Sequence, residues 1–216
     1  LIKIYEDYGY PARDAAASIV ENNLWGLDID ERAAQLAYFA VMMKARQYDR
    51  RFFNRGIQPH VYAIEESNGL KYDGDYGDFL LDKNQQATLS YMFEVFKDAK
   101  EYGSILNVEN YDWKLLRSFV SEVDTDGQMS FESVRAVASQ KLLVRLVEIG
   151  KVLARKYDAV VTNPPYMGGN GMGNKLSEYC KRSFPDSKSA LYSVFIEQCS
   201  KDEKGHRARQ PYCRGS

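Results

Sequence analysis

The sequence is poor in cysteine and histidine, the residues from which disulfide frameworks and most zinc sites are built. Its 216 residues include three cysteines and two histidines. Cys180, Cys199 and Cys213 lie far apart, are odd in number and have no histidine cluster beside them. This spacing argues against a disulfide framework and against a metal site, and it favours reduced thiols in a cytoplasmic protein. We expect His60 to begin a strand rather than to bind a ligand.

An excess of charge and a long apolar run are also missing. Lysine and arginine number 29 and aspartate and glutamate 30, which gives a formal net charge of −1 and a pI of about 6.2. Such a balance lacks the basic character of a chain that holds nucleic acid by itself. No apolar run approaches the ~20 residues of a membrane-spanning helix, so we expect no membrane partner. The hydrophobic content of 44% is typical of a globular domain with its own core.

The most informative stretch that is present joins an apolar run to Asn-Pro-Pro-Tyr. Residues 157–162 contain two adjacent valines, which favour a strand buried on both faces. Pro164 and Pro165 cannot continue a strand ladder and fix φ, so we expect Asn163 and Tyr166 to lie on a stiff turn. The turn would stand at the carboxyl end of the strand, where open α/β sheets bind ligands.

These residue types suit the methylation of an exocyclic amine. The Asn163 side-chain oxygen and the Pro164 carbonyl can each accept a hydrogen bond from one planar NH2 group. Two such acceptors favour a more pyramidal and more nucleophilic nitrogen. Tyr166 can stack on the base that carries the amine, an interaction worth roughly 1–3 kcal/mol per base. A sulfonium methyl donor is already activated, so alignment of nitrogen and methyl is most of the work.

The tetrapeptide Asn163-Pro164-Pro165-Tyr166 resembles the catalytic motif of amino-group methyltransferases that use S-adenosylmethionine. Protein-glutamine and some RNA methyltransferases share it, and a strand-ending turn without chemistry is the structural alternative. Two wider stretches, residues 21–37 and 166–169, resemble the adenine-specific DNA methyltransferases of BREX phage-resistance systems. The resemblance runs from the first residue to about Cys199.

The same resemblance implies a binding site for the methyl donor after the strand that ends at Asp28. In nucleotide-binding units an acidic residue at this place accepts hydrogen bonds from ribose hydroxyls, and here that role would fall on Asp28. Ile29 would pack on the adenine ring of the donor. Asp30 is better explained as the cap of the next helix. By analogy Glu65, after the following strand, would face the adenine amine, with the next two residues as competitors.

The expected fold is α/β, a partial Rossmann-like S-adenosylmethionine-dependent methyltransferase fold with a helical insertion. Residues 1–67 would form a partial cofactor-binding region, 68–156 the helical insertion, 157–200 the catalytic strand and loop with the following helices, and 201–216 a disordered or foreign tail. The chain begins without methionine or signal peptide, and the family's glycine-rich first motif is absent. We therefore expect an internal fragment of a larger enzyme, inactive alone.

Hydrophobic periodicity and turn residues place the individual elements. Strands are expected at 24–28, 58–66 and 157–162, and helices at 1–8, 11–20, 31–48, 87–102, 113–123, 130–156, 175–183 and 189–199. In the helix at 31–48 we expect an apolar core set, with a methionine-rich binding face as the alternative: Ala34, Leu36, Ala37, Phe39, Ala40, Met42 and Met43. A flexible acidic loop at 70–78 and a glycine-rich lid or target-base loop at 168–174 complete the prediction.

Together these features predict part of a DNA adenine-N6 methyltransferase that acts in phage defence. Its partners would be double-stranded DNA, with the target adenine flipped out of the duplex, and other proteins of the defence system. Two alternatives remain. The enzyme could instead methylate protein glutamine or RNA, or the chain could serve as a non-catalytic binding or assembly module of a defence complex.

Overall fold

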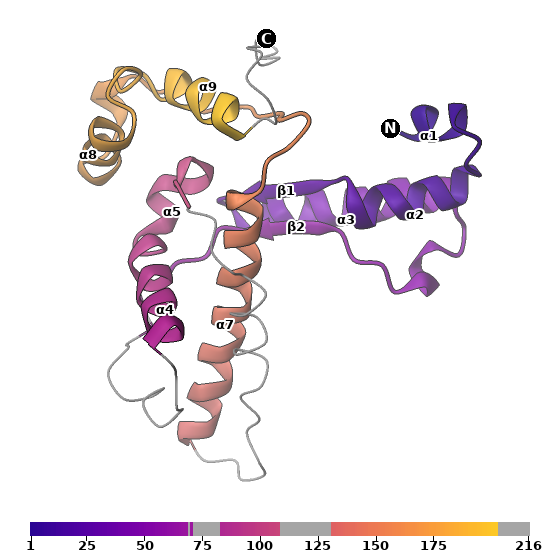
Figure 1. Cartoon of the computed structure of the whole chain (residues 1–216), viewed down its shortest axis with the longest axis horizontal. Coiled ribbons are helices and arrows are strands. Elements are labelled where there is room, and N and C mark those ends of the chain that lie inside the picture. The colour runs from indigo at the N-terminus through magenta and orange to yellow at the C-terminus, as the bar shows by residue number, and fades with distance from the viewer. Residues whose placement is uncertain (69, 71–82, 109–130, 203–216) are drawn as a thin grey trace. The chain divides into compact units, whose positions relative to one another are not determined.

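The computed structural model describes residues 1–68, 70, 83–108 and 131–202. The chain divides into two compact units, Leu1–Ile64 and Glu65–Ser216 (Figure 1). Several predicted features lie outside the described residues: the helix at 113–123, the acidic loop at 71–78, Cys213 and the tail from residue 203.

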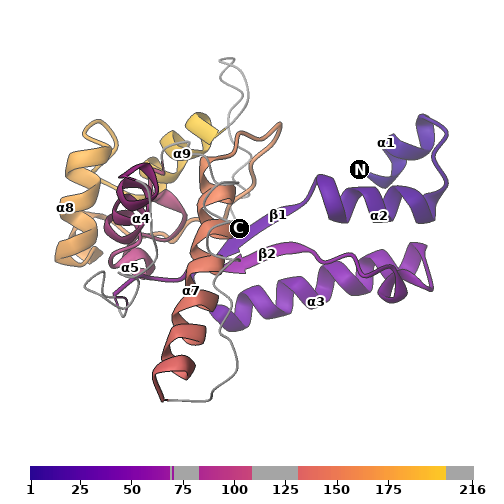
Figure 2. The same cartoon turned by 60° about the horizontal axis from the view of Figure 1, so that its bottom comes forward.

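The first unit is built around a pair of parallel strands. Its elements are α1 (Ile2–Asp7), α2 (Ala12–Asn22), β1 (Trp25–Asp28), α3 (Glu31–Tyr48), a 3-10 helix (Phe52–Arg55) and β2 (His60–Ala63). Trp25 lies opposite His60 and Asp28 opposite Ala63. The long helix α3 connects the strands and packs against both of them and against α2 (Figure 2). The first two predicted strands, the predicted start of β2 at His60 and the helices of this unit are confirmed.

Local sequence explains where the helices of this unit begin. Pro11 precedes α2 with φ −60°, the angle that its ring imposes. The Asp30 side chain accepts hydrogen bonds from the backbone N–H groups of Arg32 at 2.7 Å and Ala33 at 3.4 Å, so its predicted role as the cap of α3 is confirmed. The core formed by α2, α3 and the 3-10 helix consists of Ala17, Val20, Ala45 and Phe52, with Val41, Met42 and Ile57 packed against it.

The predicted core face of α3 is mostly wrong. Ala34 is buried and Met42 half-buried, but Leu36 is 68% exposed and Phe39 59% exposed. Ala37, Ala40 and Met43 are exposed as well. The physical reason is the narrow sheet: two strands of four residues cover only one side of an 18-residue helix. Side chains at the i, i+3 and i+7 positions from Leu36 therefore fall on the opposite side.

The second unit is helical in its described part. Its elements are α4 (Lys83–Val95), α5 (Ala99–Tyr102), a 3-10 helix (Gly103–Ile105), α7 (Phe131–Ala154), a second 3-10 helix (Gly169–Gly171), α8 (Asn174–Ser183) and α9 (Leu191–Asp202). Its fully buried large side chains are Phe96, Phe184, Leu89, Met92, Ile105, Leu146, Ile149, Val147 and Val194. The helices predicted at 130–156, 175–183 and 189–199 are confirmed, and the one at 87–102 is interrupted after Val95. In the described ranges, no helix is long and apolar enough to cross a membrane.

The strand predicted at 157–162 is wrong. Residues 158–167 belong to no strand, and Val161 is 85% exposed. A strand exists only where a neighbouring backbone completes its hydrogen-bond ladder, and the sheet of the described residues contains β1 and β2 alone. β-Branched residues by themselves do not make a strand. At the other end of this region α9 continues to Asp202, so the first two residues of the predicted tail are helical.

Candidate functional site

The tetrapeptide lies on an exposed loop anchored by one proline. Pro164 is buried, whereas Asn163 and Pro165 are exposed and Tyr166 is 72% exposed. The Pro165 carbonyl accepts a hydrogen bond from the Met167 backbone N–H at 2.9 Å, which tightens the turn. Within the part of the chain that the structure describes, neither the Asn163 side-chain oxygen nor the Pro164 carbonyl accepts a hydrogen bond. The Asn163 amide and the tyrosine ring are thus open to a ligand, whereas Pro164 itself is buried.

The chain entering this loop is fixed by the ends of two helices. The Tyr157 backbone N–H donates to the Asp202 carbonyl of α9 at 2.8 Å, and its hydroxyl donates to the Val152 carbonyl of α7 at 2.8 Å. Burial raises the pKa of Tyr157 to about 12. The Lys156 ammonium donates to the Lys201 carbonyl at 2.6 Å. These contacts, rather than a sheet, set the position from which the tetrapeptide starts.

The chain leaving the loop is fixed along one side. The Met167 carbonyl accepts from the Leu191 N–H at 3.0 Å, and the Gly169 N–H donates to the Ser189 carbonyl at 3.1 Å. Gly168 and Ala190 form an isolated antiparallel bridge between these two bonds. The beginning of the glycine-rich segment, residues 168–173, therefore lies alongside residues 189–191, where α9 starts. Its predicted role as a lid or target-base loop stays a prediction.

A second candidate site, formed by Asp28 and Ile29 of the first unit, lies at the carboxyl end of β1. Asp28 Oδ1 accepts from the Asp30 backbone N–H at 2.9 Å, which orients the carboxylate. Asp28 Oδ2 has no hydrogen-bond partner among the described residues, and Asp28 is exposed. Ile29 beside it is 50% exposed. The turn presents one open carboxylate oxygen next to an apolar surface, a combination that fits a ribose hydroxyl and an aromatic base.

Glu65 is the third residue predicted to contact the methyl donor, and it makes an ion pair that the sequence did not indicate. Its Oε1 accepts from the Arg145 guanidinium of α7 at 3.0 Å. Glu66, one competitor for its role, is half-buried. The other competitor, Ser67, is 4% exposed and its hydroxyl donates to the Phe93 carbonyl at 2.6 Å. Because Ser67 is buried whereas Glu65 and Glu66 are only half-buried, the two glutamates are better placed to accept from an amine.

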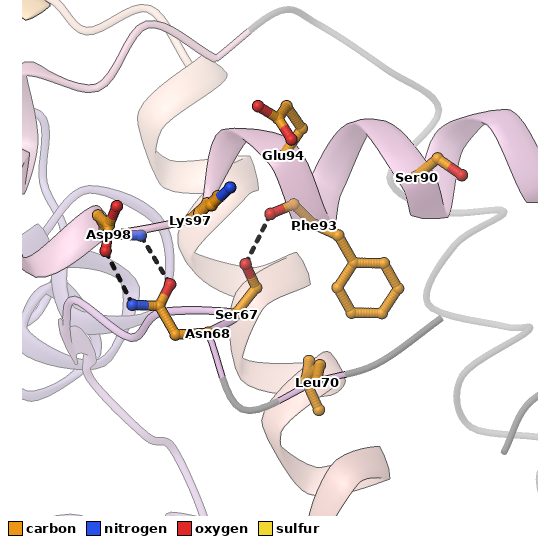
Figure 3. A pocket seen from close by; sticks show the side chains of 8 residues that line it. All are labelled: Ser67, Asn68, Leu70, Ser90, Phe93, Glu94, Lys97 and Asp98. Carbon is orange, nitrogen blue, oxygen red and sulfur yellow. Dashed lines mark hydrogen bonds between the residues drawn. The ribbon is translucent and has the colours of Figure 1, made fainter. Parts of the chain in front are cut away.

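A pocket of about 400 Å³ lies between the segment that follows β2 and helix α4 (Figure 3). It is lined by Ser67, Asn68, Leu70, Ser90, Phe93, Glu94, Lys97 and Asp98. Figure 3 shows Asn68 and Asp98 joined by two hydrogen bonds at one end of the pocket. Sequence reasoning missed Asn68, Asp98 and Arg145.

Cysteine chemistry and metal binding gain no support from the described residues. Cys180 and Cys199 are both buried, and burial raises the pKa of Cys180. In residues 1–68, 70, 83–108 and 131–202, no group of three or more histidine, cysteine, aspartate or glutamate side chains is arranged to hold a metal ion.

Known proteins resemble this chain over most of its length. Residues 22–206 match the family described as Eco57I restriction-modification methylase. The chain is 40% identical over 200 residues to the adenine-specific methyltransferase PglX of Lacticaseibacillus casei (strain Zhang), which covers 92% of this chain and 16% of that protein. It is 36% identical over 218 residues to the adenine-specific methyltransferase BrxX of Escherichia coli O9:H4 (strain HS), which covers 90% of this chain and 18% of that protein. The chain spans about a sixth of the length of these relatives, and the resemblance to adenine-specific methyltransferases is confirmed.

Proposed function

Because this chain belongs to the Eco57I restriction-modification methylase family, we propose that it carries the methyl-transfer loop of a DNA methyltransferase that modifies adenine N6. The observation that carries the proposal is the exposed loop of residues 163–166. There an exposed asparagine amide and an exposed tyrosine ring flank the Pro164 carbonyl, which accepts no hydrogen bond from the described residues. The two relatives, both named adenine-specific methyltransferases, support adenine as the base.

In this mechanism the loop positions the target amine. The Asn163 side-chain oxygen and the Pro164 carbonyl accept the two N–H bonds of N6, which directs the nitrogen lone pair away from both oxygens. Tyr166 stacks on the adenine after it leaves the duplex. Pro165 fixes the turn between these groups. S-adenosylmethionine, when bound, supplies a methyl group on a sulfonium centre, and the methylated nitrogen then loses its extra proton to solvent.

The donor would be held by the turn after β1. We assign the ribose hydroxyls to Asp28 Oδ2, the adenine face to Ile29 and the adenine amine to Glu65. Exposure of the first two residues and their neighbouring places at a strand end support this assignment. The parallel pair β1 and β2, joined by α3, supports a Rossmann-like sheet in the complete enzyme. Residues 68–156 would then be a helical insertion.

The biological setting follows from the relatives and is part of the same proposal. Double-stranded DNA would be the substrate, other proteins of a phage-defence system would be partners, and the enzyme would act in the cytoplasm. The alternatives of protein glutamine and RNA as substrate gain no support from relatives that are named adenine-specific.

The decisive test is Asn163→Ala in a full-length methyltransferase that contains this chain. We expect adenine methylation of DNA to fall more than about 100-fold, because the loss of one aligned acceptor misplaces the nitrogen. Donor binding should stay unchanged, because Asn163 is not assigned to the donor. The measurement is N6-methyladenine formed in DNA from labelled S-adenosylmethionine.

Asn54→Ala is the matched control, because Asn54 is also an exposed asparagine but lies in the 3-10 helix Phe52–Arg55, away from every proposed contact. It should methylate at the parental rate. Methylation by Asn163→Ala at that same rate would refute the proposal. If Asn163→Ala also retained protection against phage, the assembly-module alternative would be favoured.

A further inference from the structure

Asp98 has a backbone conformation that residues with a side chain rarely adopt. Its φ of 55° and ψ of 28° are left-handed, and it is the one non-glycine residue with positive φ in the described ranges. The residues on either side of this break, Phe96 and Ala99, are both fully buried. Packing therefore fixes the backbone at Asp98, and aspartate tolerates this region better than most residues. Such conformations are retained where the surrounding contacts determine them.

The contacts of Asp98 come from two distant segments. Its backbone N–H donates to Asn68 Oδ1 at 2.8 Å, and its Oδ1 accepts from Asn68 Nδ2 at 2.9 Å (Figure 3). The same Oδ1 lies 2.9 Å from the Lys175 ammonium. The hydrogen bond from Lys175, followed by the one from Asn68, holds the pKa of Asp98 below its usual value. Asp98 also raises the pKa of Lys175.

Lys175 stands where a lysine does not help its own helix. It lies in the first turn of α8, which has no acidic residue there. The amino-terminal end of a helix carries partial positive charge, so a cation at this place is unfavourable for the helix itself. The carboxylate of Asp98 offsets this charge. Helix stability therefore gives no reason for Lys175, whereas its pairing with Asp98 does.

The two segments that meet at Asp98 belong to the two sides of the proposed site. Asn68 follows Glu65, the proposed contact of the donor adenine, by three residues. Lys175 lies two residues after the end of the glycine-rich segment, residues 168–173, which itself follows Tyr166. The other side of that segment is bonded to residues 189–191. The glycine-rich segment is thus held at two places, and one of them is the Lys175–Asp98 pair.

We propose that Asp98 is a positioning residue for methyl transfer: it holds Lys175 and thereby fixes the glycine-rich segment after Tyr166 relative to the segment after Glu65. This inference rests on the proposed function of the tetrapeptide. Asp98 touches neither the target base nor the donor in this role. It acts through the position of the segment that follows the stacking tyrosine.

The test uses Asp98→Asn in the full-length methyltransferase. Asparagine tolerates the left-handed backbone and can still bond to Asn68, but it loses the charge that faces Lys175. We expect kcat to fall about fivefold, the effect that a partly exposed ion pair supports, with the KM for S-adenosylmethionine unchanged. Amide hydrogen exchange in residues 168–174 should become about fivefold faster, a readout that requires no activity.

Lys175→Met should reproduce both effects, and the double variant should show no further loss, because both changes remove one interaction. Lys181→Met, an exposed lysine elsewhere on α8, is the matched control and should behave as the parent. Asp98→Gly keeps the backbone conformation without strain. It replaces Asp98→Asn in these measurements if the asparagine variant folds poorly.

Parental kcat and parental exchange in Asp98→Asn would refute the positioning role. So would additive losses in the double variant, or faster exchange throughout the protein. These outcomes differ from a failure of the proposed function, in which Asn163→Ala and the parent methylate DNA equally or the parent does not methylate DNA at all. Accelerated exchange confined to residues 168–174, with kcat unchanged while Asn163→Ala is inactive, would refute the Asp98 role alone.

Discussion

Two turns of this molecule carry the proposed chemistry, and they are built in different ways. The turn after β1, with Asp28 and Ile29, follows a strand that is paired with β2, and the capped helix α3 begins immediately after it. The turn at residues 163–166 follows no strand, and contacts to α7 and α9 fix its flanks. The first turn is therefore determined by neighbours in the sequence and one ladder. The second depends on helices that the chain reaches through distant contacts.

This difference explains why the predicted secondary structure was confirmed at the first turn and wrong at the second. An acid that caps a helix needs only the backbone N–H groups two and three residues ahead, and Asp30 finds them. Residues 157–162 needed a partner strand, which local sequence cannot supply. Two prolines stiffen the second turn all the same, because their φ angles need no ladder. A motif can thus keep its rigidity while its expected secondary structure is absent.

Among the tests of the first turn, the largest effect is expected on removal of its open carboxylate oxygen. Asp28→Ala should weaken S-adenosylmethionine binding about 10- to 100-fold, because hydrogen bonds to a charged group contribute about 1.5–3 kcal/mol. Calorimetric titration of the donor into this chain and into the full-length enzyme would measure it. Asp28→Asn distinguishes the roles of the two carboxylate oxygens. Its amide oxygen can still accept from the Asp30 N–H, but an NH2 group takes the place of Oδ2. Equal donor affinity of the parent, Asp28→Ala and Asp28→Asn would contradict the assignment of Asp28 to the ribose.

A smaller effect tests whether the first turn depends only on contacts between residues that are close in the sequence. Asp30→Ala should lower the free energy of unfolding by about 1 kcal/mol, because two N–H groups of α3 lose their cap. Denaturant unfolding followed by circular dichroism is the measurement, and Asp30→Ser is the control that keeps a capping oxygen. Because the variant keeps the backbone N–H that donates to Asp28, and the Asp30 side chain has no assigned ligand contact, donor affinity should change less than in Asp28→Ala. The opposite order of affinities would show that the cap controls the site.

The third test concerns the pH dependence of stability near the second turn. Burial raises the pKa of Asp202 from 3.8 to about 6, and its backbone carbonyl holds Tyr157. Since the folded pKa lies above the unfolded one, the folded state binds the proton more tightly. The stability from this group is fully present below pH 3.8 and is lost as the pH rises through about 6.

Asp202→Asn should remove this contribution and flatten the pH dependence of unfolding in that window. The comparison is the difference in unfolding midpoint between the parent and the variant, measured at several pH values between about 4 and about 7. A difference that does not change with pH would contradict the expected titration of Asp202.

The sequence by itself determined the features that depend on near neighbours. These include both strands of the first unit, the cap at Asp30, the long helices and the family membership that the tetrapeptide and residues 21–37 indicated. Helical periodicity, capping and strand propensity act over a few residues, so they can be read directly along the chain.

Only the tertiary structure decided which surfaces are covered and which charges meet. Leu36 and Phe39 on α3 are large apolar residues, yet no described segment packs over them and both are exposed. Glu65 pairs with Arg145, 80 residues away, and Asn68 with Asp98, 30 residues away. No local rule gives these pairs, because burial and ion pairing depend on which distant segments the fold brings together. The same reason left residues 157–162 without a ladder.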